Sequence, residues 1–208
     1  MEYNYIVIEG NIGTGKTTLA KMLANDLNGR AVLEKFEDNP FLPKFYENPI
    51  KYAFPLEMSF LAERYNHIVS ELSDQDLFKN FTISDYHIVK SLIFAKTNLQ
   101  EDEETLFNTI YSIIFQQIPK PDLWVFLYQN PDNALKNIIN RGRDYEQSIT
   151  LDYLQKINQG YINFFKHAAN QRVLIVSTIG LDFVSNPNDY KKIKELIFQK
   201  HPFGTTYL

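Results

Sequence analysis

A glycine-rich motif near the start of the chain has residue types that suit phosphate binding. Residues 10–17 read GNIGTGKT and match the pattern G-x-x-x-x-G-K-[ST] in full. In such a loop the backbone N–H groups converge on phosphate oxygens, the lysine reaches the terminal phosphates and the last hydroxyl is a ligand for Mg²⁺. A glycine turn with a solvated lysine is the alternative, and it does not explain why a strand precedes the motif and a helix follows it. We expect a nucleoside triphosphate and Mg²⁺ to be bound by Gly10, Asn11, Ile12, Gly13, Thr14, Gly15, Lys16, Thr17 and Thr18.

Two acidic side chains follow apolar segments and are candidates for chemistry beside the phosphates. Glu34 follows a segment that reads as a strand, and a carboxylate there can accept the proton of an attacking hydroxyl. Glu37 is its nearby competitor, and a solvated acid is the alternative for either residue. Asp85 ends another such segment, where it can hold Mg²⁺ through water or assist the hydroxyl, with a helix N-cap as the alternative.

Two arginines flank a glycine in RGRDYEQ, residues 141–147. Such a pair can close over phosphates as a lid, stabilise the charge of the transferring phosphoryl group and exclude water. An exposed basic turn is the alternative, which we would favour if the phosphate-binding motif were missing. Because the motif is present, Arg141 and Arg143 are predicted to act in a lid at about residues 141–149.

The elements that position these groups follow from the hydrophobic pattern. Strands are predicted at residues 5–8, 31–36, 81–84, 123–128 and 173–177. Helices are predicted at residues 16–27, 56–72, 87–96, 103–117, 131–140, 151–168 and 188–199. This alternation is typical of a parallel sheet covered by helices on both faces, which binds ligands at the carboxyl ends of its strands. We therefore expect a single α/β domain over residues 1–208, with a three-layer P-loop NTPase fold and a five-stranded parallel sheet. No element is predicted in residues 201–208.

Composition narrows the class of protein. The 208 residues carry a net charge of −4, which argues against a nucleic-acid binder. The chain has no cysteine, which excludes disulfides, thiolate zinc sites and a cysteine nucleophile and fits a cytoplasmic protein. The longest apolar run, residues 123–128, is too short to cross a membrane, and the acid at position 2 argues against a signal peptide.

The ordered motifs resemble the P-loop deoxynucleoside kinase family over nearly the whole chain. Residues 10–18, GNIGTGKTT, are similar to the phosphate-binding loop of that family. The resemblance implies that Glu34 deprotonates the 5′-hydroxyl of a nucleoside and that Tyr46 binds the 3′-hydroxyl of its sugar. It also implies that Glu57, at the family's spacing of eleven residues from Tyr46, reads the base.

Further positions match the family in order. Arg64 resembles the arginine at the base edge, and Asp85 the acid after the third strand, which helps Thr17 with the metal. RGRDYEQ resembles the lid, in which Glu146 reaches back to the 3′-hydroxyl. Leu181, Asp182 and Phe183 resemble the loop that contacts the adenine of ATP. Phe36, Phe60 and Phe94 are expected near the base, where they can sandwich a purine or else pack in the core. The resemblance implies four catalytic residues: Glu34, Lys16, Arg141 and Arg143.

Two departures from the family bear on its chemistry. Tyr86 stands where the family has an arginine after the third-strand acid, and we expect Lys90, one helical turn on, to supply the missing charge. Glu57 stands where a glutamine is usual. An ionised carboxylate only accepts hydrogen bonds, which suits the N1–H and 2-amino donors of guanine, whereas N1 of adenine repels it unless Glu57 is protonated. Ser91, at a position that is usually acidic, also changes base discrimination.

The sequence thus predicts an enzyme that uses ATP and Mg²⁺ to phosphorylate the 5′-hydroxyl of a purine deoxynucleoside, deoxyguanosine before deoxyadenosine, in nucleotide salvage. A nucleoside monophosphate kinase of the thymidylate type is one alternative, but it needs another arginine where Tyr86 stands. A non-catalytic nucleotide switch is another, but no NKxD motif or switch-like threonine segment is present. The helix at 103–117 and its neighbour resemble the dimer-forming helices of the family, with core packing as the alternative. We expect a cytoplasmic homodimer with a small-molecule substrate and no nucleic-acid or membrane partner.

Overall fold

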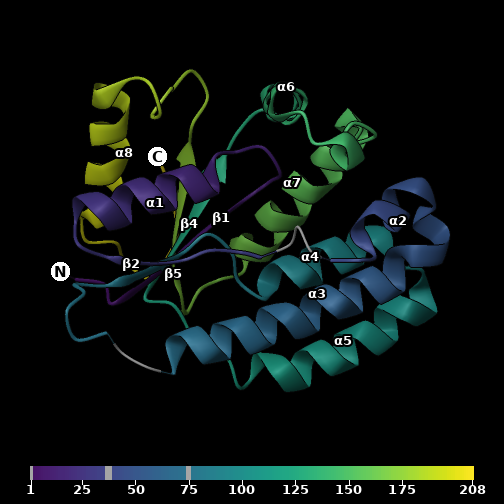
Figure 1. The fold of residues 1–208 in the computed structure, drawn as a ribbon. Coiled ribbons are helices and arrows are strands. Elements are labelled where there is room, and N and C mark those ends of the chain that lie inside the picture. The colour runs from purple at the N-terminus through teal and green to yellow at the C-terminus, as the bar shows by residue number, and fades with distance from the viewer. Residues whose placement is uncertain (1, 36–38, 74–75) are drawn as a thin grey trace.

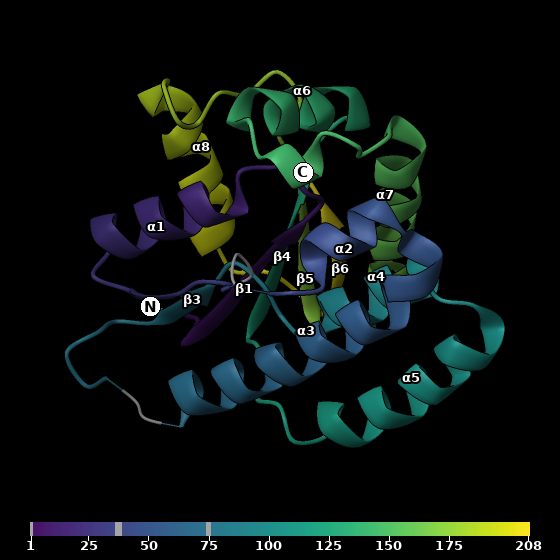
Figure 2. The same ribbon diagram turned by 45° about the vertical axis from the view of Figure 1, so that its right-hand side comes forward.

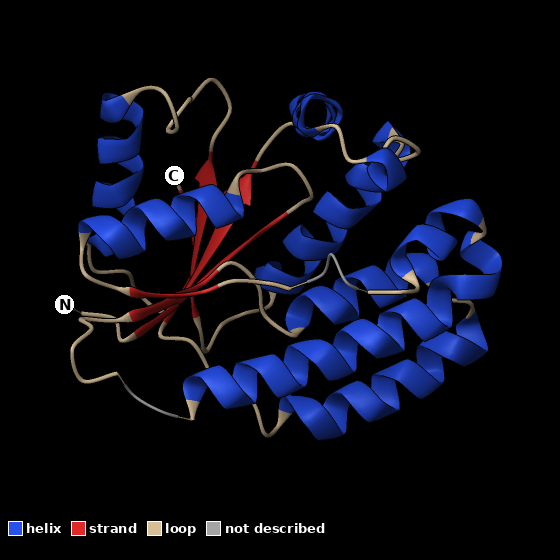
Figure 3. Ribbon diagram, viewed as in Figure 1, coloured by secondary structure: helices blue, strands red, loops and turns tan. Residues whose placement is uncertain are grey.

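The computed structural model describes residues 2–35, 39–73 and 76–208. Within these residues one parallel sheet is formed by β1 (Tyr5–Gly10), β2 (Arg30–Val32), β3 (Thr82–Ser84), β4 (Leu123–Tyr128), β5 (Arg172–Ser177) and β6 (Gly204–Tyr207). The strands lie in the order β2-β3-β1-β4-β5-β6, so β1, which leads into the phosphate-binding motif, is central (Figures 1 and 3).

Helices cover both faces of the sheet, as predicted. They are α1 (Lys16–Asp26), α2 (Leu42–Glu47), α3 (Pro49–Leu72), α4 (Val89–Asn98), α5 (Glu101–Phe115), α6 (Pro131–Arg141), α7 (Leu151–Lys166) and α8 (Pro187–Phe198), with a short 3₁₀ turn, η1 (Asp144–Glu146). Helices α1 and α8 lie on one face, and α4 and α7 lie on the other with α3, while α5 lies outside α3 (Figures 1 and 2). The layers match the predicted P-loop NTPase fold.

Alternate residues of β1 show why both faces need cover. Ile6 and Ile8 are buried in a cluster with side chains of α1 and α8, whereas Tyr5 and Val7 are buried in a second cluster with side chains of α4 and α7. Successive side chains of a strand point to opposite faces, so a strand covered on both sides has apolar residues at consecutive positions, as residues 5–8 do.

The prediction of five strands is wrong, because the described residues contain a sixth. Strand β6 pairs in parallel with β5, with Gly204 opposite Arg172 and Tyr207 opposite Ile175. Its sequence, GTTY, has no apolar run, and its side chains are partly exposed at the edge of the sheet. Backbone pairing defines this strand, so a hydrophobic pattern does not reveal it.

Strand β2 is shorter than the predicted 31–36. It pairs with β3 alone, and the ladder ends where Val32 meets Ser84. Glu34 therefore lies in the loop beyond the strand rather than on it. The chain leaves the sheet at this point (Figure 1).

Helix α3 begins seven residues before the predicted start at 56. Asn48 caps it by accepting a hydrogen bond from the backbone N–H of Lys51 at 3.3 Å, and Pro49 occupies the first turn. Within the part of α3 that was predicted, Glu57, Phe60 and Arg64 lie at helical spacing on one buried face. None of the helices in the described part of the chain has the length and apolarity that a bilayer-spanning helix needs.

Candidate active site

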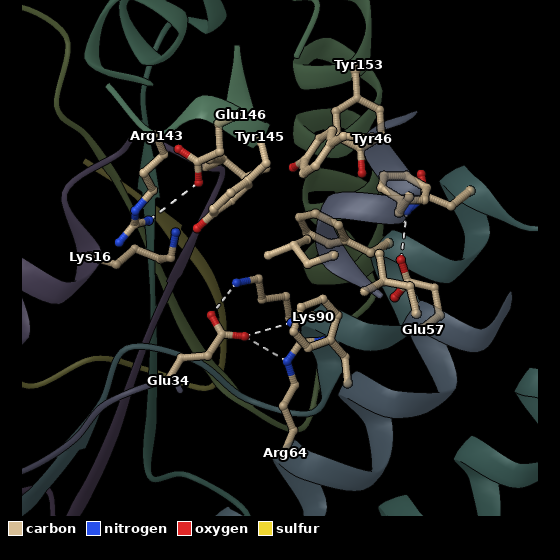
Figure 4. A pocket seen from close by; sticks show the side chains of 18 of the residues that line it. Lys16, Glu34, Tyr46, Glu57, Arg64, Lys90, Arg143, Tyr145, Glu146 and Tyr153 are labelled. Atoms are coloured by element: carbon tan, nitrogen blue, oxygen red, sulfur yellow. Dashed lines mark hydrogen bonds and ion pairs between the residues drawn. The ribbon is translucent and has the colours of Figure 1, made fainter. Parts of the chain in front are cut away.

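A cavity at the carboxyl ends of β1 and β3 is enclosed by the phosphate-binding motif, α2, α3, α4, α7 and the segment around η1 (Figure 4). It brings together residues that are far apart in sequence. The predicted site residues that line it are Ile12, Gly13, Lys16, Thr17, Glu34, Tyr46, Glu57, Phe60, Arg64, Asp85, Lys90, Phe94, Arg141, Arg143 and Glu146. Of the residues predicted to be close to the site, Phe36 and the competitor Glu37 lie outside the described residues.

The phosphate-binding motif needs glycine at two of its turns. Gly13 and Gly15 have φ angles of 79° and 83°, which L-residues with side chains rarely adopt. A Cβ atom at Gly13 would lie 2.5 Å from the backbone oxygen of Ala134 in α6, and one at Gly15 would lie 2.7 Å from the ring of Phe183. The loop is therefore packed tightly between α6 and the segment that contains Phe183.

Two side chains of the motif hold the loop in place. The Asn11 amide is fully buried and donates to the backbone oxygen of Leu154 at 2.7 Å and to Oδ1 of Asn158 at 2.8 Å, both in α7. The Thr14 hydroxyl donates to the backbone oxygen of Asn11 at 3.0 Å. The side chains of Asn11 and Thr14 thus fix the shape of the loop. The side chain of Thr18 is exposed on α1.

The ammonium of Lys16 donates to the backbone oxygen of Asn11 at 2.7 Å. Burial lowers the pKa of Lys16, and repulsion from the Lys90 ammonium lowers it further. A triphosphate would relieve this repulsion, because its negative charge favours the protonated form of the amine.

Glu34 reaches into the same cavity and is held by two cations (Figure 4). Its Oε1 accepts from Arg64, at 2.8 Å from Nε and 2.7 Å from Nη2, and its Oε2 lies 2.5 Å from the Lys90 ammonium. Burial alone would raise the pKa of Glu34, but Lys90 and Arg64 lower it to about 2. The carboxylate is therefore ionised at neutral pH and oriented through both oxygens.

Asp85 joins the end of β3 to the phosphate-binding motif. Its Oδ2 accepts a hydrogen bond from the Thr17 hydroxyl, and its Oδ1 accepts one from the backbone N–H of Glu34 at 2.8 Å. A carboxylate and a hydroxyl side by side are oxygen donors of the kind that Mg²⁺ prefers, so these residues fit the metal. The N-cap alternative for Asp85 is wrong, because Ile88 occupies that position of α4.

Tyr86 contributes no group to this cavity. Its hydroxyl is hydrogen-bonded to Nδ1 of His67 in α3 at 2.6 Å, and its ring is buried in a cluster between α3 and α5. The residue at the position that the family usually gives to arginine thus pairs with His67. The ammonium of Lys90, from α4, reaches Glu34 instead.

The lid arginines pair with an acid of their own segment. Glu146 in η1 is buried and accepts from Arg141, at 3.1 Å from Nε and 2.5 Å from Nη2, and its Oε1 lies 3.4 Å from Nη1 of Arg143. Tyr46 lies nearby, stacked on Tyr145 with ring centroids 6.1 Å apart. Burial raises the pKa of Tyr46, and the charge of Glu146 adds to this effect. Tyr46 and Glu146 thus line the same part of the cavity.

The far end of the cavity contains Glu57 and two aromatic rings. The carboxyl group of Glu57 accepts through Oε1 from Nδ2 of Asn98 at 2.7 Å, and burial raises its pKa to about 7. The Arg64 guanidinium lies over the ring of Phe60 at 4.6 Å, and its Nη1 donates to the Ser91 hydroxyl at 2.6 Å. Phe94 also lines the cavity, and the Lys90 ammonium lies over its ring at 5.7 Å from the centroid.

Several lining residues were not predicted: Leu42, Phe45, Leu56, Asn98, Tyr145 and Tyr153. Asn98 could have been found, because Lys90, Phe94 and Asn98 recur every four residues on one face of α4. Glu9, at the end of β1, was also missed. It is fully buried and accepts from the backbone N–H of His87 at 2.7 Å and from the Tyr161 hydroxyl at 2.8 Å, and burial raises its pKa.

The predicted adenine loop lies beside the motif rather than in the cavity. Phe183 is buried in the cluster between α1 and α8, and it approaches Gly15. The Asp182 carboxylate accepts from the backbone N–H groups of Val184 and Ser185, at 3.2 and 3.0 Å. Leu181 packs against the same cluster. Contact of these residues with adenine stays a prediction.

Comparisons with known proteins agree with the family resemblance of the sequence motifs. A family model described as deoxynucleoside kinase matches residues 6–201. A deoxyguanosine kinase of Bacillus subtilis is 37% identical and covers 93% of this chain and 97% of its own length. A deoxyadenosine kinase of Lactobacillus acidophilus is 29% identical, over 94% and 95% of the two chains. A solved structure of deoxyadenosine kinase from M. mycoides with bound dATP has a TM-score of 0.79, at 21% identity over 92% of this chain and 97% of that one, and shares the fold.

Proposed function

The chain belongs to the deoxynucleoside kinase family, and from this premise we propose that its cavity carries the γ-phosphoryl group of ATP to the 5′-hydroxyl of a purine deoxynucleoside. The enzyme is a phosphotransferase that uses ATP as donor and Mg²⁺ as metal cofactor. The main support for the proposed roles is the position of the Glu34 side chain. Its ionised carboxylate lines the same cavity as Lys16 and is oriented by Arg64 and Lys90.

Glu34 is proposed as the general base. Because two cations hold it ionised, it can accept the proton of the 5′-hydroxyl as the oxygen attacks the γ-phosphorus and the bond to the β-phosphate oxygen breaks. Lys16, Arg141 and Arg143 would stabilise the charge on the transferring group. When bound, Mg²⁺ neutralises phosphate charge, and Thr17 with Asp85 would hold it. The lid arginines must then turn from Glu146 toward the phosphates.

The opposite end of the cavity is proposed to select the acceptor. Tyr46 and Glu146 would bind the 3′-hydroxyl, and Phe60 and Phe94 would flank the base. Glu57 would read the base edge, with guanine preferred because an ionised carboxylate accepts from N1–H and the 2-amino group. Relatives that are named as deoxyguanosine and deoxyadenosine kinases are consistent with a purine.

The test is an acceptor panel. The protein is mixed with Mg·ATP and each common deoxynucleoside or deoxynucleoside monophosphate, and ADP and products are measured. We expect ADP with purine deoxynucleosides. ADP formed equally without an acceptor overturns the kinase proposal, and product from monophosphates alone supports the alternative of a monophosphate kinase.

Glu34→Gln tests the base. It should still bind deoxynucleoside while turnover falls by about 10²- to 10⁴-fold, the usual contribution of a positioned base. Glu195→Gln, an exposed glutamate on α8, is the matched control and should retain wild-type turnover. Undiminished turnover in Glu34→Gln would assign the role of base to another group.

A homodimer is proposed through the outer face of α5. Phe107 and Tyr111 of this helix pack against the core, while Leu106 and Ile113, seven residues apart, form an exposed apolar stripe that is 52% and 61% exposed. Helix α5 lies at the periphery beside α3 (Figure 2). Sedimentation should show a dimer that Ile113→Glu dissociates. A wild-type monomer at micromolar concentration would contradict the proposal.

The chain is further proposed to act as one domain, with residues 141–149 as the lid. We infer a cytoplasmic location, because the chain has no cysteine and so cannot form the disulfides that are common in oxidising compartments. The net charge of −4 likewise supports a small-molecule substrate over a nucleic-acid or membrane partner.

A further inference from the structure

Glu57 has a carboxyl oxygen without a protein partner at the base end of the cavity. The residue is 1% exposed, and its Oε2 accepts no hydrogen bond from any described residue. Glu57 lines the cavity from α3, and its side chain is labelled in Figure 4. A buried oxygen that is left unpaired is costly, so the arrangement suits a ligand that supplies the missing partner.

Asn98 makes the two oxygens of Glu57 unequal. Its Nδ2 donates to Oε1 at 2.7 Å, so Oε1 is committed as an acceptor. A proton on this carboxyl group is therefore best placed on Oε2, which has no hydrogen-bond partner among the described residues. Oε2 can then act in two ways, as an acceptor when the group is ionised and as an O–H donor when it is protonated.

Burial and the neighbouring cations act on the pKa of Glu57 in opposite directions. Burial raises the pKa of Glu57 to about 7, although Arg64, Asn98 and Lys90 lower it, and Glu34 adds to the rise. Both protonation states are thus populated near neutral pH. The charged and titratable groups that face Glu57 come from α3, α4, the loop after β2, α2 and α7: Arg64, Lys90, Glu34, Tyr46 and Tyr153.

Guanine and adenine differ most simply at N1. N1 of guanine carries a hydrogen and donates, whereas N1 of adenine accepts. We propose that Oε2 of Glu57 pairs with N1 of either purine, as a carboxylate with guanine and as a carboxylic acid with adenine, so that the base preference of the enzyme changes with pH. This inference rests on the proposed function and names how one residue would select between two substrates.

The test is the ratio of kcat/KM for deoxyguanosine to that for deoxyadenosine, measured with wild-type enzyme from about pH 6 to about pH 8.5. Effects of pH on ATP, Glu34 or the lid act on both substrates and cancel in the ratio. If complementarity at N1 is strict, the ratio rises about tenfold per pH unit, because the ratio of ionised to protonated Glu57 does so. A ratio that stays constant within about twofold across this range overturns the proposal.

Deoxyinosine separates N1 from the 2-amino group. It shares N1–H and the 6-oxygen with deoxyguanosine but has no 2-amino group. Its kcat/KM relative to deoxyadenosine should rise with pH in the same way. A flat deoxyinosine ratio beside a rising deoxyguanosine ratio would overturn the assignment to N1.

Two variants test the carboxyl group and its orientation. Glu57→Gln cannot titrate, so its deoxyguanosine-to-deoxyadenosine ratio should be independent of pH and should favour adenine. Asn98→Ala removes a donor to the charged form, which raises the pKa of Glu57 and moves the whole ratio profile to higher pH. A purely structural role for Asn98 would lower both kcat/KM values and leave the profile in place.

The two proposals can fail separately. If no deoxynucleoside yields ADP and a monophosphate, the proposed function fails. If both purine deoxynucleosides are phosphorylated but the wild-type ratio is flat, only the inference on Glu57 fails. The wild-type measurement decides even if a variant does not fold.

Discussion

Replacement of Lys90 by methionine removes one of the two cations that hold Glu34. The side chains are similar in length, so the change takes away the charge while it keeps most of the volume. Lys90 is only partly buried on α4, and its ammonium lies 2.5 Å from Oε2 of Glu34. We expect Glu34 to lose orientation on that side while Arg64 continues to hold Oε1.

The size of the effect follows from the pKa of Glu34, which lies at about 2 instead of the ordinary 4.5. This depression corresponds to about 3 kcal/mol in favour of the ionised form. For an acid with a lowered pKa, this stabilisation is present above about pH 4.5 and is lost as pH falls toward 2. A contacting charge shifts a carboxyl pKa by about 1 to 3 units, so Lys90→Met should raise the pKa of Glu34 by that amount.

The assay is the pH profile of kcat/KM. In Lys90→Met the acid limb should move to higher pH, because Glu34 protonates more readily. The alkaline limb should also move to higher pH, because the Lys90 ammonium no longer lowers the pKa of Lys16. Turnover at neutral pH should fall on the order of 10- to 100-fold, as for the loss of a positioning contact. Lys90→Arg should restore much of it.

Lys96→Met is the matched control, because Lys96 is exposed on the same helix. It should leave both limbs and turnover unchanged. Wild-type turnover in Lys90→Met with both limbs in place would contradict this role of Lys90. So would a Lys90→Arg variant that is as impaired as Lys90→Met.

Three further outcomes are expected. Gly13→Ala, whose Cβ would lie 2.5 Å from a backbone oxygen, should raise KM for ATP at least about tenfold and lower the unfolding free energy by about 1–3 kcal/mol in urea titrations. Glu57→Gln should be more stable than wild type by about 3 kcal/mol at about pH 8, where the buried carboxyl group of the wild type is ionised. Because the pKa of Glu57 is raised, the stabilisation that its protonated form provides is present below pH 4.5 and is lost as pH rises through about 7. The difference in stability between the two proteins should therefore close in acid. Tyr46→Phe should raise KM for deoxyguanosine about tenfold but leave KM for 2′,3′-dideoxyguanosine unchanged, because only the former has a 3′-hydroxyl to lose.

The sequence predicted those site residues whose positions follow from the geometry of a parallel sheet. Glu34 and Asp85 follow β2 and β3, and the carboxyl ends of parallel strands lie at one edge of the sheet. The glycine motif specifies its own backbone shape, so it could be located without any tertiary information. The fold class was also predictable, because the central strands of a parallel sheet are buried on both faces and contain short apolar runs that alternate with helices.

Groups that depend on backbone pairing or on a neighbour's identity were not predictable. Strand β6 has no apolar run and is defined by its ladder with β5. Tyr86 pairs with His67, which lies 19 residues away on α3, and no local pattern encodes that contact. The helical spacing with Lys90 and Phe94 could have placed Asn98 at the site, but its pairing with Glu57, 41 residues away, depends on how the helices pack.

The ion pairs of the cavity are of two kinds, one between residues close in sequence and one between residues far apart. Arg141 and Arg143 pair with an acid five and three residues away, while the partners of Glu34 lie 30 and 56 residues away. The lid arginines are 36% and 24% exposed, so water screens their pairing, whereas Arg64 and Lys90 are 5% and 12% exposed. Phosphates can therefore compete for the lid arginines at modest cost but cannot readily displace the partners of Glu34. The division suits the proposed roles, in which Glu34 is a base that stays oriented and Arg141 and Arg143 exchange Glu146 for phosphates in each turnover.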